Sequence, residues 1–278
     1  MASRFDATSP ENYILNCSTL LTEHAVVDRA DAAARAGFSR VEFWWPFDGE
    51  PRPADADVDA FVDSLSAAGV SLAGLNFWAG NMAGGDRGMV SVAGHRSEFA
   101  DNAALAAEIG RRTGCTAFNA LYGLRQDDQE PQAQDELAVE NLLTAAQTVA
   151  PLGGTVLVEP VSGADAYPLK TAADALAVIE KVHRAGATNV ALLADFFHLA
   201  INGDDVAAVI EQHAHRFGHV QIADAPGRGA PGTGELPLQE WIDLAYARGY
   251  DGAVALEYKQ EEATAFDWLR RPAGTSRG

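Results

Sequence analysis

The sequence predicts a (β/α)8 barrel, in which eight parallel strands are each followed by a helix. Short β-rich runs alternate with longer Ala-rich amphipathic runs along the whole chain of 278 residues. A helix that ends in Ala-Gly or Arg-Gly and then enters a β-branched run recurs in ARAGFSRVEF, SAAGVSLAGL, HRAGATNVAL and YARGYDGAVAL. Eight such units in about 250 residues fit this barrel.

The strands are expected where β-branched and aromatic residues cluster, and the helices where apolar residues recur with helical spacing. The expected strands are 13–17, 39–45, 71–78, 115–121, 155–160, 189–196, 219–224 and 253–258. The expected helices are 23–36, 55–68, 96–112, 132–150, 170–185, 204–215 and 237–248, with a short last one near 261–270. Gly37, Gly69, Gly114, Gly186 and Gly249 each follow an amphipathic run and can take the left-handed conformation that ends a helix.

A doubly wound sheet also alternates strands and helices, and it is the rival fold. Such a sheet usually has fewer strands, and a Gly-rich turn follows its first strand, whereas STLLTEH follows Cys17 here. No Pro/Gly/Ser-rich linker and no shift in composition divides the chain. We therefore expect one barrel domain over residues 1–278.

The charge balance limits the partners of this chain. It has 20 Lys and Arg against 39 Asp and Glu, a net charge of −19, which excludes nucleic acid and anionic membrane surfaces as main partners. Cys17 and Cys115 lie in apolar runs and are expected to be buried, reduced thiols. The N-terminal stretch lacks an apolar signal segment and no run approaches about 18 apolar residues, so a cytoplasmic protein is expected.

Polar residues end four successive strands in the second half of the chain. They are Glu159, Asp195, Gln221 and Glu257, with separations of 36, 26 and 36 residues. The alternation of each strand turns these residues inward, and barrel enzymes carry their reacting groups at this end of the strands. Three converging carboxylates would repel one another without a cation, and an all-oxygen set favours Mg²⁺ or Mn²⁺ over zinc. The alternative is that these residues only cap strand ends and bind loop amides.

Two cations and two loops are further candidates. Arg228, after the seventh strand, could clamp substrate oxygens or a carboxylate; the alternative is an ordinary solvated arginine. Lys259 is a second possible cation; the alternative is an outward salt-bridge residue.

The Gly-rich segment 78–88 is expected to be a lid that excludes water, or else a disordered connection. GRGAPGTG at 227–234 is expected to be a flexible loop. Trp44, Trp45 and Phe47 could wall the pocket or pack under the helices.

Several segments together resemble the hydroxypyruvate isomerases, within the xylose isomerase-like barrel superfamily that also holds ketose 3-epimerases and inosose dehydratases. The segments are VLVEP, ADFFH, HVQIADAPGRGAPGTGEL, ALEYK, ARAGFSRVEFWWPF and AGNMAGGDRG, and they cover most of the chain. Related 3-epimerases usually have His where this chain has Gln221, which favours the isomerase branch.

The resemblance implies roles for the residues already singled out. Glu159, Asp195, Gln221 and Glu257 would be the metal ligands, and Glu159 and Glu257 also the proton donor and acceptor. His198 would contact the substrate, or else be a residue of a loop or helix start. Relatives often form dimers or larger assemblies, so a homo-oligomer is also expected.

The chain departs from the isomerases at three places. Gly229 and Ala230 replace a usual His-Glu pair, Ala200 stands where Gln is frequent, and WAGNM replaces a PAGDW-like string. These positions lie at expected substrate contacts, so they leave the substrate open.

The function predicted is conversion of hydroxypyruvate to tartronate semialdehyde through an enediolate. A 2-oxo-tetronate isomerase, a ketose 3-epimerase or an inosose dehydratase-like lyase could use the same site. A non-catalytic metabolite-binding barrel and a DNA-repair nuclease are also considered; the glutamate pair argues against the first and the charge against the second.

Overall fold

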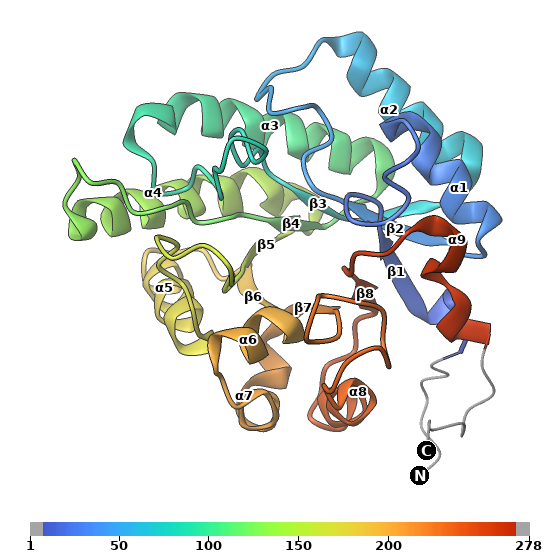
Figure 1. Ribbon diagram of the computed structural model, residues 1–278. Coiled ribbons are helices and arrows are strands. Elements are labelled where there is room, and N and C mark those ends of the chain that lie inside the picture. The colour runs from blue at the N-terminus through green and yellow to red at the C-terminus, as the bar shows by residue number, and fades with distance from the viewer. Residues whose placement is uncertain (1–7, 271–278) are drawn as a thin grey trace.

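The computed structural model describes residues 8–270, and its strands close into one barrel in the order β1 to β8 with every neighbouring pair parallel (Figure 1). The predicted fold class is confirmed. The strands are β1 (Tyr13–Asn16), β2 (Arg40–Phe43), β3 (Ser71–Asn76), β4 (Ala117–Asn119), β5 (Thr155–Val158), β6 (Val190–Asp195), β7 (Phe217–Ile222) and β8 (Val254–Leu256). The extent of the domain to the two chain ends stays a prediction, since those ends lie outside the described residues.

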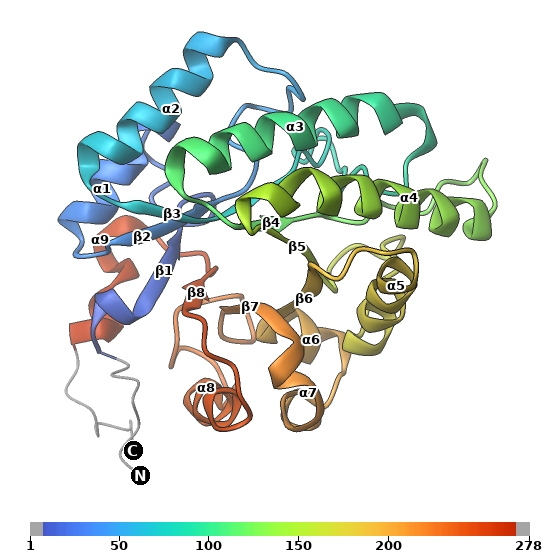
Figure 2. The ribbon, with the colours of Figure 1, turned by 180° about the vertical axis from the view of Figure 1, so that it is seen from behind.

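Helices surround the barrel, as the front and back views show (Figures 1 and 2). They are α1 (Arg29–Arg35), α2 (Asp55–Ala68), α3 (Arg96–Thr113), α4 (Pro131–Val149), α5 (Ala172–Arg184), α6 (Phe196–Asn202), α7 (Val206–His213), α8 (Leu238–Ala247) and α9 (Glu262–Ala265). The five glycines predicted to end helices all have positive φ angles, between 68° and 111°. Among the described residues, no helix is long and apolar enough to cross a membrane.

The observed helices differ from the prediction at two places. The first helix was expected from residue 23, but Ala25 is extended (φ −60°, ψ 150°) and a 3-10 turn precedes α1, so the helix begins at Arg29. Helix α6 was not expected, because the sixth strand was predicted to run through residue 196. Asp195 ends that strand and caps α6 directly, which leaves no loop between the two elements.

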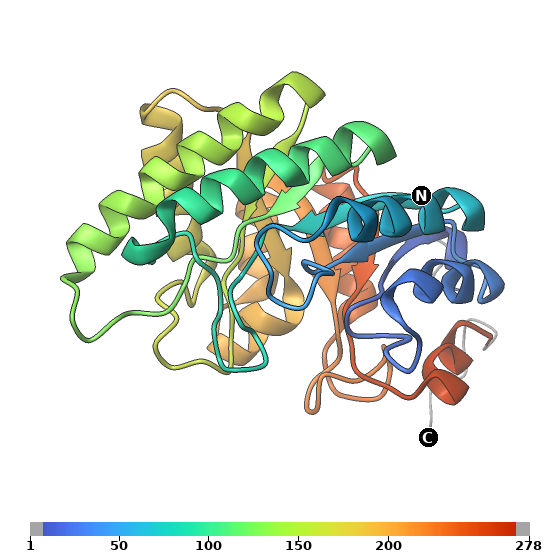
Figure 3. The same cartoon turned by 90° about the horizontal axis from the view of Figure 1, so that it is seen from above.

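The loops that follow the strands gather on one side of the barrel, below the strands in Figure 3. The core under the helices is apolar and includes fully buried Phe43, Phe61 and Phe118. At the loop side the strands instead end in buried polar residues. Parallel pairing places Asp195 of β6 beside Gln221 of β7, so the polar ends of adjacent strands meet in register.

Candidate active site

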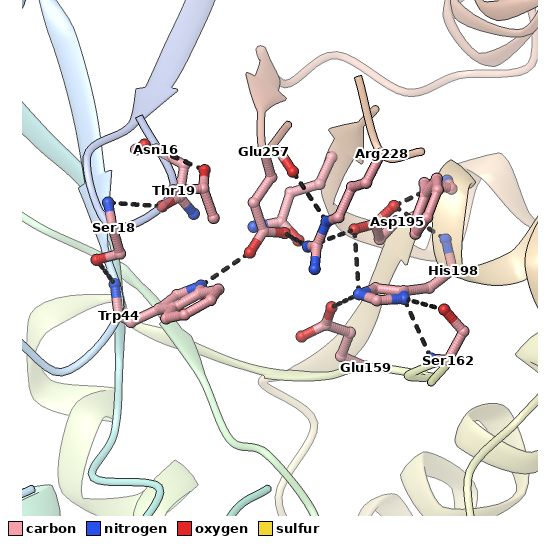
Figure 4. A network of polar contacts seen from close by, with 12 residues as sticks. Asn16, Ser18, Thr19, Trp44, Glu159, Ser162, Asp195, His198, Arg228 and Glu257 are labelled. Carbon is pink, nitrogen blue, oxygen red and sulfur yellow. Dashed lines mark hydrogen bonds and ion pairs between the residues drawn. The ribbon is translucent and has the colours of Figure 1, made fainter. Parts of the chain in front are cut away.

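A pocket of about 410 Å³ lies at the carboxyl ends of the strands. It is the usual place for a site in this fold. Its lining includes Trp44, Asn76, Met82, Ala83, Arg87, Leu121, Glu159, Val161, Ser162, His198, Arg228, Glu257 and Lys259. Five predicted site residues therefore line one cavity, namely Glu159, His198, Arg228, Glu257 and Lys259. Figure 4 shows the polar contacts of the first four.

Glu159 follows β5 and is held from the neighbouring strand. Its Oε2 accepts a hydrogen bond of 2.7 Å from Nδ2 of Asn119, and only 5% of the residue is exposed. Burial, together with the nearby Asp195 carboxylate, raises the pKa of Glu159 to about 8. A carboxyl group with this fixed orientation and this pKa is suited to exchange a proton near neutral pH.

Glu257 follows β8 and is held from the opposite direction. Its Oε1 accepts a hydrogen bond of 2.8 Å from the indole Nε1 of Trp44, and its Oε2 lies 3.1 Å from Nη2 of Arg228 (Figure 4). Burial raises the pKa of Glu257 well above its usual range, although the Arg228 guanidinium opposes this shift. The two glutamates therefore differ in their partners.

Asp195 divides its two oxygens between structure and site. Its Oδ1 accepts from the backbone N–H groups of Phe197 and His198, at 2.8 and 3.2 Å, and so caps α6. Oδ1 therefore has the capping role at the strand end that was the alternative to metal binding. Oδ2 of Asp195 lies 3.8 Å from Nη2 of Arg228, a residue that lines the pocket.

Gln221 is oriented by a buried network that the sequence reasoning missed. Its Nε2 donates to Oε1 of Glu42 at 2.7 Å, and the same oxygen accepts from Asn16 at 2.8 Å. The other oxygen of Glu42 lies 2.7 Å from Nε2 of His219, which is also buried. Because Nε2 of Gln221 is bound to Glu42, the amide is fixed in orientation, and its Oε1 has no hydrogen-bond partner among the described residues.

The donor set fits a hard divalent cation. Oδ2 of Asp195, Oε1 of Gln221 and Oε2 of Glu257 are buried and have no hydrogen-bond partner among the described residues, although Arg228 forms ion pairs with the two carboxylate oxygens. Leaving buried polar atoms unpaired is costly, and oxygen-rich sites of this kind select Mg²⁺ or Mn²⁺. Glu159, Asp195 and His198 also offer ligand atoms within 4.8 Å of one another, so His198 enters the cluster as well.

Arg228 extends from a tight turn into the carboxylate cluster. The turn is closed by hydrogen bonds in both directions between the backbones of Asp224 and Gly229, and Arg228 has a positive φ of 55°. Its Nε donates to the backbone oxygen of Glu257, and its guanidinium carbon lies 5.5 Å from the centroid of the Phe197 ring. Lys259 also lines the pocket and is exposed.

The loops around the pocket only partly match the predictions. Met82, Ala83 and Arg87 of segment 78–88 line the pocket, as a lid requires, but its mobility stays a prediction. The loop after β7 was expected to be flexible, and its mobility likewise stays a prediction. In the structure the buried carboxylate of Asp224 accepts four backbone N–H groups from residues 225, 232, 234 and 236, which supports the turn that carries Arg228.

Only one of the three aromatic residues after the second strand reaches the pocket. Trp44 lines it, whereas Trp45 and Phe47 stack edge to face with ring centroids 5.0 Å apart. Phe47 also contacts Phe61 of α2, so packing explains these two residues.

The chain matches the family described as "Xylose isomerase-like TIM barrel" over residues 30–272. It is 46% identical to a Streptomyces coelicolor protein named "Putative hydroxypyruvate isomerase", over 95% of this chain and 96% of that protein. It is 32% identical to a 2-oxo-tetronate isomerase of Cupriavidus necator, over 93% and 97% of the two chains. Among solved structures, one titled AP endonuclease, family 2 from Brucella melitensis superposes with a TM-score of 0.81 at 31% identity, over 93% and 97% of the two chains.

Proposed function

This chain belongs to the xylose isomerase-like TIM barrel family, and from that premise we propose that it is a metal-dependent aldose-ketose isomerase of a short hydroxy-oxo acid. The substrate we propose is hydroxypyruvate, and the product is tartronate semialdehyde. The reaction moves a proton between two neighbouring carbons and exchanges a ketone for an aldehyde.

The observation that carries this proposal is the pair of buried glutamates. Asn119 binds one oxygen of Glu159 and Trp44 binds one oxygen of Glu257, so each carboxyl group of these two pocket residues is fixed at one oxygen, and the second oxygen of Glu257 lies 3.1 Å from Nη2 of Arg228. Two separately fixed acid and base groups suit a reaction that removes a proton from one carbon and returns it to the next. A protein that only senses a metabolite has no use for them.

The remaining residues supply cation binding and substrate orientation. Glu159, Asp195, Gln221 and Glu257 would hold Mg²⁺ or Mn²⁺, which when bound supplies a Lewis acid for the carbonyl group. Arg228 and Lys259 would orient the substrate carboxylate, giving local positive charge that the net charge of −19 conceals. Met82 and Arg87 would limit access of water from the lid side.

The proposal is tested by following hydroxypyruvate with the Mg²⁺- or Mn²⁺-loaded protein in D₂O by NMR. We expect tartronate semialdehyde to appear with solvent deuterium at the carbon that receives the proton; product without deuterium would indicate a hydride shift or a shielded proton. Glu159→Gln and Glu257→Gln should each lower kcat at least 100-fold, whereas the exposed Glu240→Gln on α8 should not. Turnover that survives both glutamate substitutions would contradict the assigned roles.

A 2-oxo-tetronate isomerase is the second candidate. A cavity of about 410 Å³ can hold a four-carbon acid as easily as a three-carbon one. Turnover of a 2-oxo-tetronate but not of hydroxypyruvate would assign this substrate, and turnover of a ketose or inosose alone would assign a 3-epimerase or a lyase. A nuclease would need a basic groove, which the net charge of −19 opposes.

We propose a cytoplasmic setting for this enzyme. Both cysteines are free and buried, as expected of a protein in a reducing compartment. Assembly into a homo-oligomer remains part of the proposal.

A further inference from the structure

We propose that His198 is a neutral hydrogen-bond donor, through its Nε2, to the substrate oxygen that becomes negative during the reaction. We further propose that Ser162 is the positioning residue that fixes His198 in this form. The identity of the substrate oxygen rests on the proposed isomerase function, whereas the protonation form rests on the geometry around the imidazole ring.

The contact between Ser162 and His198 determines which ring nitrogen carries the proton. The backbone nitrogen of Ser162 lies 3.1 Å from Nδ1 of His198, and its hydroxyl oxygen lies 2.7 Å from the same atom (Figure 4). A hydroxyl group can donate or accept, but a backbone N–H can only donate. Nδ1 must therefore accept, and it carries no proton.

The ring is consequently the neutral form with its hydrogen on Nε2. A doubly protonated ring would place an N–H at Nδ1, against the backbone N–H of Ser162. Burial disfavours a positive charge on the ring, in agreement with the neutral form. Only 5% of His198 is exposed.

The Nε2–H group points into the site and is not used by the protein. Nε2 lies 3.7 Å from Oδ2 of Asp195 and 3.9 Å from Oε1 of Glu159, both too long for a hydrogen bond (Figure 4). Among residues 8–270, the hydrogen bonds of the His198 ring are those at Nδ1 with Ser162. The hydrogen is therefore available to a ligand oxygen that sits beside Glu159.

The same geometry argues against His198 as a metal ligand, although its ring belongs to the Glu159 and Asp195 cluster. A histidine that binds a metal commonly donates the hydrogen of its other nitrogen to a carbonyl or carboxylate group. Here the other nitrogen receives hydrogen bonds instead of donating one. The nitrogen that faces the cluster thus carries a proton where a ligand needs a free electron pair.

In the reaction, this donor would stabilise charge as it develops. When a glutamate takes the proton from the carbon next to the carbonyl, the C–H electron pair forms the new C=C bond and the carbonyl π pair moves to oxygen. A donor fixed at that oxygen costs no reorganisation during the step. A neutral imidazole donates without protonating the enediolate fully, so the proton returns from the glutamate.

The test is a long-range ¹H–¹⁵N NMR measurement on protein labelled at histidine, with the His198 signals identified by their loss in His198→Gln. We expect a protonated-type shift at Nε2 and an unprotonated-type shift at Nδ1 between about pH 6 and 8. His183 is an internal reference, because its Nε2 lies 2.8 Å from the carbonyl oxygen of Val190 and must be protonated. Adding Mg²⁺ should leave the His198 pattern unchanged. A proton at Nδ1, or loss of the Nε2 proton on adding Mg²⁺, would overturn the inference.

Two variants test the role of Ser162. Ser162→Ala removes the hydroxyl but keeps the backbone N–H, so the Nε2–H form should remain while the Nδ1 shift moves and kcat falls about 2- to 10-fold at unchanged KM. Ser162→Thr restores a hydroxyl and should restore both values. Equal spectra and equal kcat for the wild type and Ser162→Ala would reject Ser162 as a positioning residue. Since the NMR pattern needs no turnover, its result separates this inference from the choice of substrate.

Discussion

The indole N–H of Trp44 lies 2.8 Å from Oε1 of Glu257, which joins residues 213 positions apart in the chain. The backbone N–H of Trp44 in turn donates to Oγ of Ser18 at 2.9 Å. Strands β2 and β8 both pair with β1. The residues that follow these three strands are thus connected by polar contacts. One oxygen of the proposed catalytic glutamate is fixed by this connection, and the other is left for Arg228.

Trp44→Phe should lower kcat because Glu257 loses the bond that fixes its orientation. A hydrogen bond to a charged group contributes about 1.5–3 kcal/mol, so we expect a decrease of about 10- to 100-fold, measured by steady-state kinetics. Trp45→Phe is the matched control: its indole donates to the backbone oxygen of Glu50 and does not line the pocket. Equal kinetics for the two variants would show that the Trp44 bond does not position Glu257.

The hydrogen bond between Asn119 and Glu159 can be tested by exchanging its donor and its acceptor. Asn119→Asp places a second carboxylate at 2.7 Å from Oε2 of Glu159 and should destabilise the protein by about 1–3 kcal/mol in urea unfolding. Adding Glu159→Gln supplies a donor on the other side, so the double variant should regain most of this stability without regaining activity. Additive losses in the double-mutant cycle would contradict a direct bond.

The four polar strand ends of the candidate site were predictable from sequence because position in a strand determines direction. Glu159, Asp195, Gln221 and Glu257 stand out as polar residues at the ends of apolar strands, and three of their oxygens are buried without a hydrogen-bond partner among the described residues. That they bind a metal remains a prediction. Helix α6 was not predictable, because a capping Asp195 joins strand and helix without any turn signal.

The buried polar residues that hold the site in place were missed, because only the last four strands were searched for inward polar residues at their ends. The first four end in, or carry near their ends, Asn16, Glu42, Asn76 and Asn119, all buried. His219 shares the inward face with Gln221 two residues later, which was a signal for its pairing with Glu42. The strand pattern does not predict which amide binds which carboxylate, because the two partners lie on strands that are distant in sequence.

Asp224 should be the main determinant of the loop that presents Arg228. Its two carboxylate oxygens accept four backbone N–H groups, and Asn in its place retains only one oxygen to accept them. We expect Asp224→Asn to lower the free energy of unfolding by about 2–4 kcal/mol in urea titrations. The exposed Asp63→Asn on α2 is the matched control and should change it by less than about 0.5 kcal/mol. A loss of similar size in both variants would contradict the assigned role.

The two cysteines should be inert in the native protein. Burial raises the pKa of the Cys115 thiol to about 12 and that of Cys17 further, and each is at most 1% exposed. From the ordinary value of 9.0, this shift alone lowers the thiolate fraction of Cys115 about a thousandfold. We expect no reaction with a thiol-specific disulfide reagent at pH 8 and reaction of both cysteines in guanidinium. Rapid native labelling of either thiol would contradict their burial.

Gln221 offers the sharpest test of the proposed cation site. Mg²⁺ or Mn²⁺ at about 100 times its Kd should stabilise the native protein by about 2.7 kcal/mol and raise the Tm by several degrees in thermal unfolding. Gln221→Leu removes the unpaired oxygen and should weaken this shift for both ions, whereas Gln221→His restores a ligand atom. Because an imidazole nitrogen is a softer ligand than an amide oxygen, the His variant should favour Mn²⁺ over Mg²⁺ more than the wild type does. The exposed Gln239→Leu on α8 controls for the loss of an amide. An undiminished Tm shift in Gln221→Leu would remove Gln221 from the ligand set and leave the three carboxylates as the site.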